Sequence, residues 1–221
     1  MDKSSKQSAS APAVKSKTKA GSRRASPSPK ETAGSTDDKL QGLTFHEVDR
    51  GRFNDLVTLF ESRGGPKNCW CMVWRANSVE ARRTGGASRK AAFTRRVRQG
   101  VPVGILGYVD AKPIAWCSIA PRSTYRNLGG AAEKTGETVW SLVCFFVTRE
   151  YRGQGMATRL MRAAIDHARQ RGATVIEAYP VHPDSPSYRF MGFVPAFERA
   201  GFVEVGRAGR RRHVMQLKLV P

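Results

Sequence analysis

Residues 139–157 read VWSLVCFFVTREYRGQGMA, and this stretch decides the fold class. Its first nine residues form a continuous apolar run, which is typical of a central strand buried on both faces. A turn that contains Gly153 and Gly155 follows, and residues 157–171 repeat apolar side chains at the spacing of an amphipathic helix. Residues 175–179 predict another strand. The order of strand, glycine turn, helix and strand predicts a parallel crossover.

The turn has the features of an anion-binding site. Glycines let the backbone adopt positive φ and approach a ligand closely. A helix N-terminus offers unpaired N–H groups and the positive end of the helix dipole, so the two together suit a pyrophosphate. Arg152 and Arg159 add positive charge. The Gly-Lys-Ser/Thr of nucleotide phosphate loops and the full dinucleotide fingerprint are absent, and a turn that merely joins strand to helix is the alternative.

Hydrophobic spacing predicts the elements on both sides of this stretch. The predicted strands are 44–48, 105–109, 114–119, 202–205 and 213–219, and the predicted helices are 53–60, 88–99 and 195–200. Residues 110–113, DAKP, are a hairpin signal, and Gly100 ends one of the helices. A hairpin therefore precedes the crossover, and a strand pair follows it.

Residues 1–42 are a basic tail rich in Ser, Ala, Lys and Pro, and residues 43–221 form the folded domain. The tail has too few large apolar side chains to offset its ordering entropy, so we predict that it is disordered. No apolar run follows its basic residues, which argues against a secretory signal, and no stretch is long and apolar enough to span a membrane. We therefore expect a cytoplasmic protein without a membrane partner.

The folded domain is strongly basic in its own right. The chain has a net charge of +20, of which residues 41–221 contribute +15. A basic domain attracts polyanions, so a phosphorylated cofactor and nucleic acid, the latter through the basic tail, are candidate partners. A basic surface that is only solvated explains the charge equally well.

The four cysteines predict no metal site. Cys69 and Cys71 are too close in sequence for the common zinc pairs, and Cys117 and Cys144 lie within apolar runs that read as strands. We expect buried, reduced thiols.

Residues 147–157, VTREYRGQGMA, resemble the acyl-CoA signature of the GNAT superfamily of N-acetyltransferases, Arg/Gln-x-x-Gly-x-Gly/Ala. Residues 197–202, FERAGF, are similar to the later aromatic-Glu-x-x-Gly-Phe segment of that family. Further segments resemble a poorly characterised bacterial subgroup, namely 69–72, 115–122, 140–147 and 177–181. The resemblance covers residues 43–219 and implies an α/β (α+β) fold with a mixed central sheet flanked by helices.

The resemblance also implies acetyl-CoA as a co-substrate. The strand that ends at Val147 would pair its backbone with the pantetheine arm, and the N–H groups of residues 153–158 would hold the pyrophosphate. The acetyl group would lie where this strand and the strand 175–179 move apart. The implied cofactor-binding residues are Phe145, Phe146, Val147, Arg152, Gly153, Gln154, Gly155, Met156, Ala157 and Thr158.

In the family, an amine attacks the thioester directly, a base removes the amine proton and an acid protonates the thiolate. Phe197 stands where a Tyr acid is common, and a phenyl ring donates no proton. The candidate acids are Tyr188, Tyr179 and Cys144, and the candidate bases are Glu177, Glu137 and His182. We predict Glu177 and Tyr188 as the catalytic pair. The other interpretation of Glu177 is a salt-bridged or solvent-facing strand residue.

The resemblance therefore implies an N-acetyltransferase that moves the acetyl group of acetyl-CoA to a primary amine of a small molecule or a peptide. The alternative is a non-catalytic domain of this fold that binds acyl-CoA or RNA through its basic surface. The tail has no aromatic residues to stack on bases, which weakens the RNA alternative. A homodimer is compatible with either function. Four tryptophans are open to two interpretations, since each either lines an acceptor pocket or packs in the core: Trp70, Trp74, Trp116 and Trp140.

Overall fold

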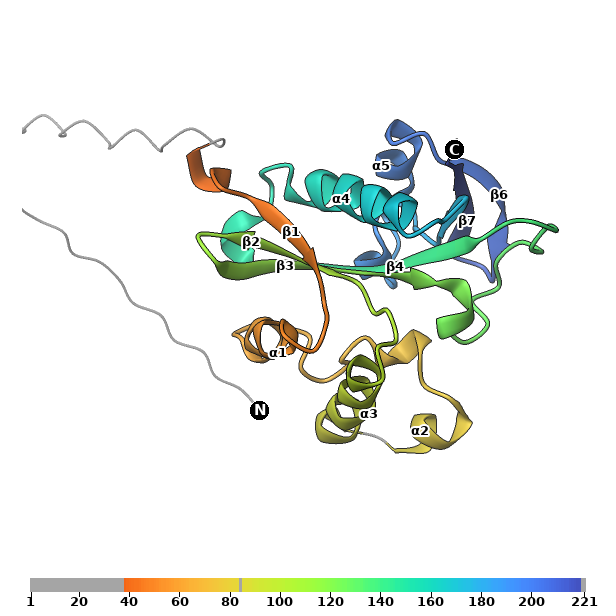
Figure 1. The fold of residues 1–221 in the computed structure, drawn as a ribbon. Coiled ribbons are helices and arrows are strands. Elements are labelled where there is room, and N and C mark those ends of the chain that lie inside the picture. The colour runs from red at the N-terminus through yellow and green to blue at the C-terminus, as the bar shows by residue number, and fades with distance from the viewer. Residues whose placement is uncertain (1–37, 84, 220–221) are drawn as a thin grey trace, which may run out of the picture. The chain divides into compact units, whose positions relative to one another are not determined.

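The structure is a computed structural model, and it describes residues 38–83 and 85–219. Its centre is a seven-stranded sheet with the strand order β1-β2-β3-β4-β5-β7-β6 (Figure 1). The strands are β1 (Thr44–Glu47), β2 (Ile105–Val109), β3 (Lys112–Pro121), β4 (Val139–Val147), β5 (Val175–Ala178), β6 (Val203–Ala208) and β7 (Arg212–Lys218). β4 and β5 are parallel, and every other neighbouring pair is antiparallel. The predicted mixed sheet is confirmed.

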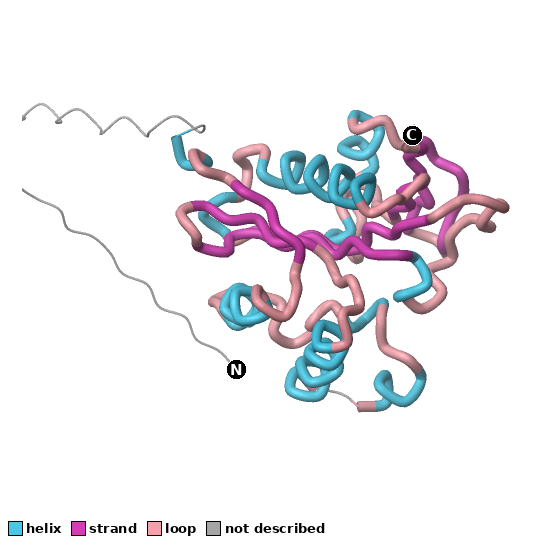
Figure 2. Tube along the Cα trace, viewed as in Figure 1, coloured by secondary structure: helices cyan, strands magenta, loops and turns pink. Residues whose placement is uncertain are grey.

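Helices cover both faces of this sheet (Figure 2). On one face lie α4 (Met156–Gln170) and α5 (Val194–Arg199), and on the other lie α1 (Phe53–Glu61), α2 (Ser78–Arg82) and α3 (Gly86–Arg98) (Figure 1). The chain runs from β4 through α4 into the parallel strand β5, which confirms the predicted crossover. Each face of the sheet has its own core of buried apolar side chains.

The apolar stripe of α4 explains why this helix packs on the sheet. Leu160, Ala164 and Ala168 recur every four residues and are fully buried in the core that α4 shares with α5. Gly172, with a φ of 80°, follows the helix in the left-handed conformation that ends it. The helix begins at Met156, directly after the glycine turn, so its N-terminus stands at the end of β4.

Three features of the N-terminal part differ from the predictions made from the sequence. Apolar spacing does not predict α2, because none of its five residues is buried. Gly85 rather than Ser88 is the N-cap of α3. Leu40, assigned above to the tail, is 5% exposed and packs in the core on the α4 face. The predicted disorder of residues 1–37 lies outside the described residues.

Glu80 fastens α2 to α3 through two arginines. Its carboxylate accepts hydrogen bonds from Arg96 Nη2 at 2.6 Å and from Arg95 Nη2 at 2.9 Å. The Arg96 hydrogen bond is the largest cause that lowers the pKa of Glu80 from 4.5 to about 2. A carboxyl group whose pKa is lowered by folding stabilises the fold above its unfolded pKa, and this stabilisation is lost as the pH falls through the folded pKa.

We therefore expect Glu80→Gln to lower the free energy of unfolding by about 2 kcal/mol at pH 7 and by only about 1 kcal/mol at pH 3. Urea denaturation at the two pH values measures both losses. Glu61→Gln is the control, because Glu61 forms only an exposed pair with Lys90 and such pairs contribute little. Equal losses at both pH values would contradict the role given to the Glu80 charge.

The cysteines are free thiols. Cys71, Cys117 and Cys144 are buried as predicted, whereas Cys69 is only half-buried. Burial raises the pKa of the Cys117 thiol well above its ordinary value. Among the residues that the structure describes, no cluster of His, Cys, Asp and Glu side chains is arranged to hold a metal ion. Within the same residues, no helix combines the length and the apolarity that a bilayer crossing requires.

Candidate cofactor and acceptor site

β4 has an unpaired edge over its C-terminal half. It pairs with β5 only over Val139–Leu142, while its pairing with β3 continues to Val147. The register with β3 shifts at Val143, which is the extra residue of a β-bulge, and a bulge bends the strand that contains it. β4 and β5 therefore separate beyond Leu142, as predicted. The edge of Phe145–Val147 that points away from β3 pairs with no strand of the sheet.

The turn after β4 presents a row of backbone N–H groups. Gly153 and Gly155 have φ of 75° and 72°, a left-handed conformation that favours glycine. Within the described part of the chain, no group accepts a hydrogen bond from the N–H groups of residues 153–157. A Cβ at either glycine would meet no atom within 4 Å, so there is room for a ligand over the turn. The N–H of Thr158 differs, because it donates to the Gly155 carbonyl at 3.1 Å.

Two side chains hold the shape of this turn. Arg152 Nε donates to the Val147 carbonyl at 2.8 Å, and Gln154 Nε2 donates to the Glu150 carbonyl at 2.8 Å. Arg152 is exposed, and its guanidinium lies 6.0 Å from the ring centre of Phe146. Both bonds tie the turn to the end of β4, so the positive charge of Arg152 stays beside the free N–H groups.

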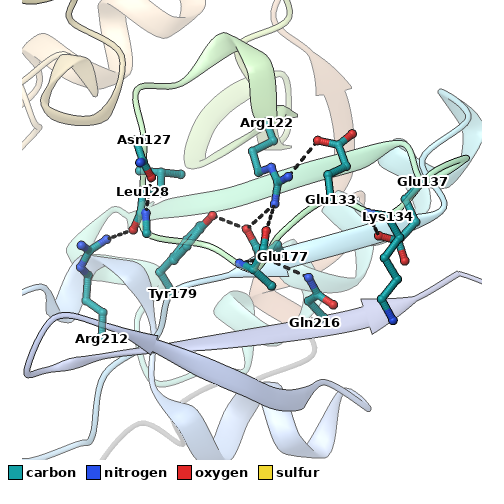
Figure 3. A network of polar contacts seen from close by, with 12 residues as sticks. Arg122, Asn127, Leu128, Glu133, Lys134, Glu137, Glu177, Tyr179, Arg212 and Gln216 are labelled. Carbon is teal, nitrogen blue, oxygen red and sulfur yellow. Dashed lines mark hydrogen bonds and ion pairs between the residues drawn. The ribbon is translucent and has the colours of Figure 1, made fainter.

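Glu177 lies on β5 and is fully buried on the face opposite α4, since its neighbours Ile176 and Ala178 pack in the α4 core. Its carboxylate accepts hydrogen bonds from four groups (Figure 3): Tyr179 Oη at 2.5 Å, Gln216 Nε2 at 2.9 Å, the Ala131 N–H at 3.0 Å and Arg122 Nη1 at 3.4 Å. A Cβ at Gly130 would lie 2.0 Å from this carboxylate, so only glycine fits there. Glu177 thus fastens the segment around residues 122–131 to the sheet.

The neighbours of Glu177 explain what its carboxylate can do. Burial, followed by the negative charge of Glu177, raises the pKa of Tyr179 above its ordinary value of 10, so the phenol remains a proton donor at neutral pH. Four donors occupy the lone pairs of the two carboxylate oxygens, as expected for a salt-bridged strand residue. Of the alternative bases, Glu137 accepts from the Lys134 N–H, and the His182 side chain is 67% exposed. The catalytic role of Glu177 stays a prediction.

Tyr188 and Phe197 lie in different surroundings. Tyr188 is 36% exposed, and its ring centre is 6.0 Å from that of Trp74. The Tyr188 hydroxyl has no hydrogen-bond partner among the described residues. Phe197 is fully buried, and its ring centre lies 6.2 Å from that of Phe145. The position of Phe197 is therefore part of the core beneath β4.

Arg126 and Arg212 are site residues that were not predicted from the sequence. Their guanidinium carbons lie 5.4 Å and 4.7 Å from the ring centre of Trp74. All four tryptophans pack in the two cores, and Trp74 is the one that also lies beneath these two arginines. The only signal in the sequence was the basic run 207–212, and its composition does not say which of its arginines meets an aromatic ring.

The sequence model of the Acetyltransferase (GNAT) family matches residues 70–193, more than half of the chain. The chain belongs to the GNAT acetyltransferase family. The match contains β4, the glycine turn, α4 and β5, which are the elements that build the candidate site. GNAT proteins are usually acetyl-CoA-dependent N-acetyltransferases.

Solved structures resemble this chain at low sequence identity. An uncharacterised protein (bh2621) from Bacillus halodurans is 14% identical, with a TM-score of 0.54 over 80% of this chain and 83% of that chain. A ribosomal-protein-alanine N-acetyltransferase from Brucella melitensis is 17% identical, with a TM-score of 0.49 over 80% and 99%. The putative acetyltransferase yncA from Salmonella typhimurium, solved with acetyl-CoA, is 16% identical, with a TM-score of 0.48 over 81% and 95%. A search of curated proteins finds no match.

Proposed function

We propose that this GNAT protein is an N-acetyltransferase that moves the acetyl group of acetyl-CoA to a primary amine by direct attack. The observation that carries the proposal is the row of free N–H groups at residues 153–157, next to the unpaired edge of β4. Two linked phosphates supply acceptors for these donors, and the N-terminus of a helix favours their negative charge. The amides of a pantetheine arm suit an open strand edge.

The residues present fit this cofactor. The open space over Gly153 and Gly155 has room for the phosphates, and Arg152 adds a cation. Phe145–Val147 would hold the pantetheine arm through their backbone, with the cofactor's thioester as the activated acetyl donor. The contribution of the chain is to hold the amine against that thioester, since positioning alone can supply about 7 kcal/mol or more of a barrier.

Tyr188 and Glu177 have different roles in the proposal. Tyr188 is the candidate proton donor to the departing thiolate, because its hydroxyl is partly exposed and has no partner among the described residues. Glu177 is better suited to positioning, because its lone pairs are already occupied by donors from Tyr179 just after β5, from β7 and from the 122–131 segment. It would hold the wall of the acceptor side in place.

Thiol release from acetyl-CoA across a panel of primary amines tests the proposal. We expect release that depends on the amine, with an equal amount of N-acetylated product by mass spectrometry. Two further measurements accompany the thiol-release assay: calorimetry with CoA, and RNA binding as a function of salt concentration. RNA binding without a detectable heat of CoA binding would overturn the acetyltransferase proposal in favour of a nucleic-acid-binding domain.

A further inference from the structure

Two arginines share one aromatic surface without a counter-ion. Arg126 and Arg212 both lie over the Trp74 ring, and Arg212 also lies 5.9 Å from the ring centre of Tyr179 and 5.6 Å from that of Tyr188. Arg126 Nη1 donates to the Val73 carbonyl, and Arg212 Nη1 donates to the Leu128 carbonyl at 2.9 Å (Figure 3). Neither guanidinium forms an ion pair with a carboxylate of residues 38–83 or 85–219.

Several other arginines of the domain are paired with carboxylates instead. Arg122 pairs with Glu133, Arg96 pairs with Glu80, and Arg169 pairs with Asp166. At the Trp74 surface, burial is the largest cause that lowers the pKa of Arg212; Tyr188 and then Tyr179 act in the opposite direction, and the charge of Arg126 adds the smallest effect, which lowers this pKa further. Two like charges that are held together and partly removed from water repel each other, and a bound anion relieves this repulsion.

One further hydrogen-bond donor and free space lie at the Trp74 surface. The Trp74 indole N–H is buried and has no hydrogen-bond partner among the described residues. Two hollows open beside the arginines, one lined by Arg126 and the other by Arg212. One, of about 260 Å³, is lined by Arg126 and Tyr179 among others, and one, of about 620 Å³, is lined by Tyr188 and the turn at residues 208–212.

The location of this surface relates it to the open edge of β4. Trp74 and Tyr179 belong to the same core cluster as Val143 and Cys144, the residues at which β4 leaves β5. Arg212 pairs with Val181, just beyond the end of β5. α4 packs in the other core, on the opposite face of the sheet (Figure 1). The pair of arginines is therefore separated by the sheet from the helix whose N-terminus carries the free N–H groups.

We propose that Arg126 and Arg212 bind an oxyanion, a carboxylate or a phosphate, of a small amine acceptor. This inference rests on the proposed acetyltransferase function and names the substrate class of the same site. Two guanidinium groups provide charged donors for an oxyanion, and Trp74, Tyr179 and Tyr188 provide flat surfaces for the carbon skeleton. The buried carboxylate of Glu177, to which Tyr179 donates, already accepts hydrogen bonds from four groups. It is therefore not free to pair with the amines of a polyamine, to which this surface is poorly suited.

Matched acceptors test the inference. The panel holds ω-amino acids with two to five methylene groups, the aminoalkylphosphonates of the same lengths, the neutral carboxamides and a polyamine. We expect the full-length protein to prefer one of the two anionic series, which also distinguishes carboxylate from phosphate-like acceptors. Arg126→Gln and Arg212→Gln should each raise KM for the preferred anion about 10-fold, while KM for the carboxamide changes less than about 2-fold.

Arg169→Gln is the matched control, because it removes the same charge from a distant part of α4 and should leave both KM values unchanged. Equal KM changes for anionic and neutral acceptors, or a preference for the polyamine, would overturn the inference while leaving the acetyltransferase proposal intact. Loss of CoA binding and of thiol release with every amine would instead overturn the proposed function. A third outcome is that the protein shows no preference among acceptors but binds RNA, and that Arg126→Gln and Arg212→Gln both weaken this binding. The ligand of the two arginines would then be a nucleic acid and not a small anionic amine.

Discussion

Replacing Gly155 with valine is expected to raise the Kd for CoA at least about 100-fold, which corresponds to about 2.7 kcal/mol. Gly155 has a φ of 72° and is the N-cap residue of α4, and a β-branched side chain strongly disfavours this conformation. The turn would therefore shift and its N–H groups would no longer converge. The new side chain would also fill the open space over the turn. Calorimetry with CoA on the folded variant measures the change.

Gly172→Val is the control for this prediction. Gly172 has a φ of 80°, and a Cβ there also meets no atom within 4 Å, but it lies at the opposite end of α4. The strain of a valine at positive φ is therefore similar, whereas the free N–H groups are untouched. CoA binding within about 3-fold of the original in Gly155→Val would remove the basis of the acyl-transfer proposal.

Replacing Glu177 with leucine is expected to lower the free energy of unfolding by about 3–5 kcal/mol. Leucine accepts no hydrogen bonds, so the Tyr179 hydroxyl and the Ala131 N–H would lose their acceptor in a buried place, and Arg122 would lose one of its two carboxylates. Urea denaturation measures the loss. Glu137→Gln is the control, because Glu137 lies in the loop before β4 and, among the described residues, its side chain bonds only to the Lys134 N–H, so its loss should stay within about 0.5 kcal/mol.

Glu177→Gln separates the two roles of this residue. Glutamine keeps the shape of the side chain, so we expect the variant to fold and its pH profile of kcat/KM to keep its form. If Glu177 is a positioning residue, its replacement shifts the 122–131 segment and so changes KM for the acceptor. A fall in kcat of about 10²-fold or more, together with the loss of the acidic limb of the profile, on which the rate rises as the base is deprotonated, would instead identify Glu177 as the general base.

The sequence by itself determined the parallel crossover and the glycine turn, with its free N–H groups, inside that crossover. The apolar run of β4, the glycine turn and the stripe of α4 each depend on side chains or N–H groups only a few positions apart. The free N–H groups of residues 155–157 follow from the start of a helix, whatever packs around it. For the same reason, the hairpin of β2 and β3 and the strand pair of β6 and β7 were predictable, whereas α2, with no buried side chain, was not.

Only the tertiary structure decided what surrounds the acceptor side. The partners of Glu177 include Ala131 and Arg122, which lie 46 and 55 positions away, and the order β5-β7 brings Gln216 beside it. Alternation along a strand indicates which face a side chain takes, but not which groups from distant segments meet it there. Likewise, Arg126 and Arg212 meet over Trp74 only because three segments far apart in the sequence, namely the short helix that ends at Trp74, the loop with Arg126 and the start of β7, converge where β4 leaves β5.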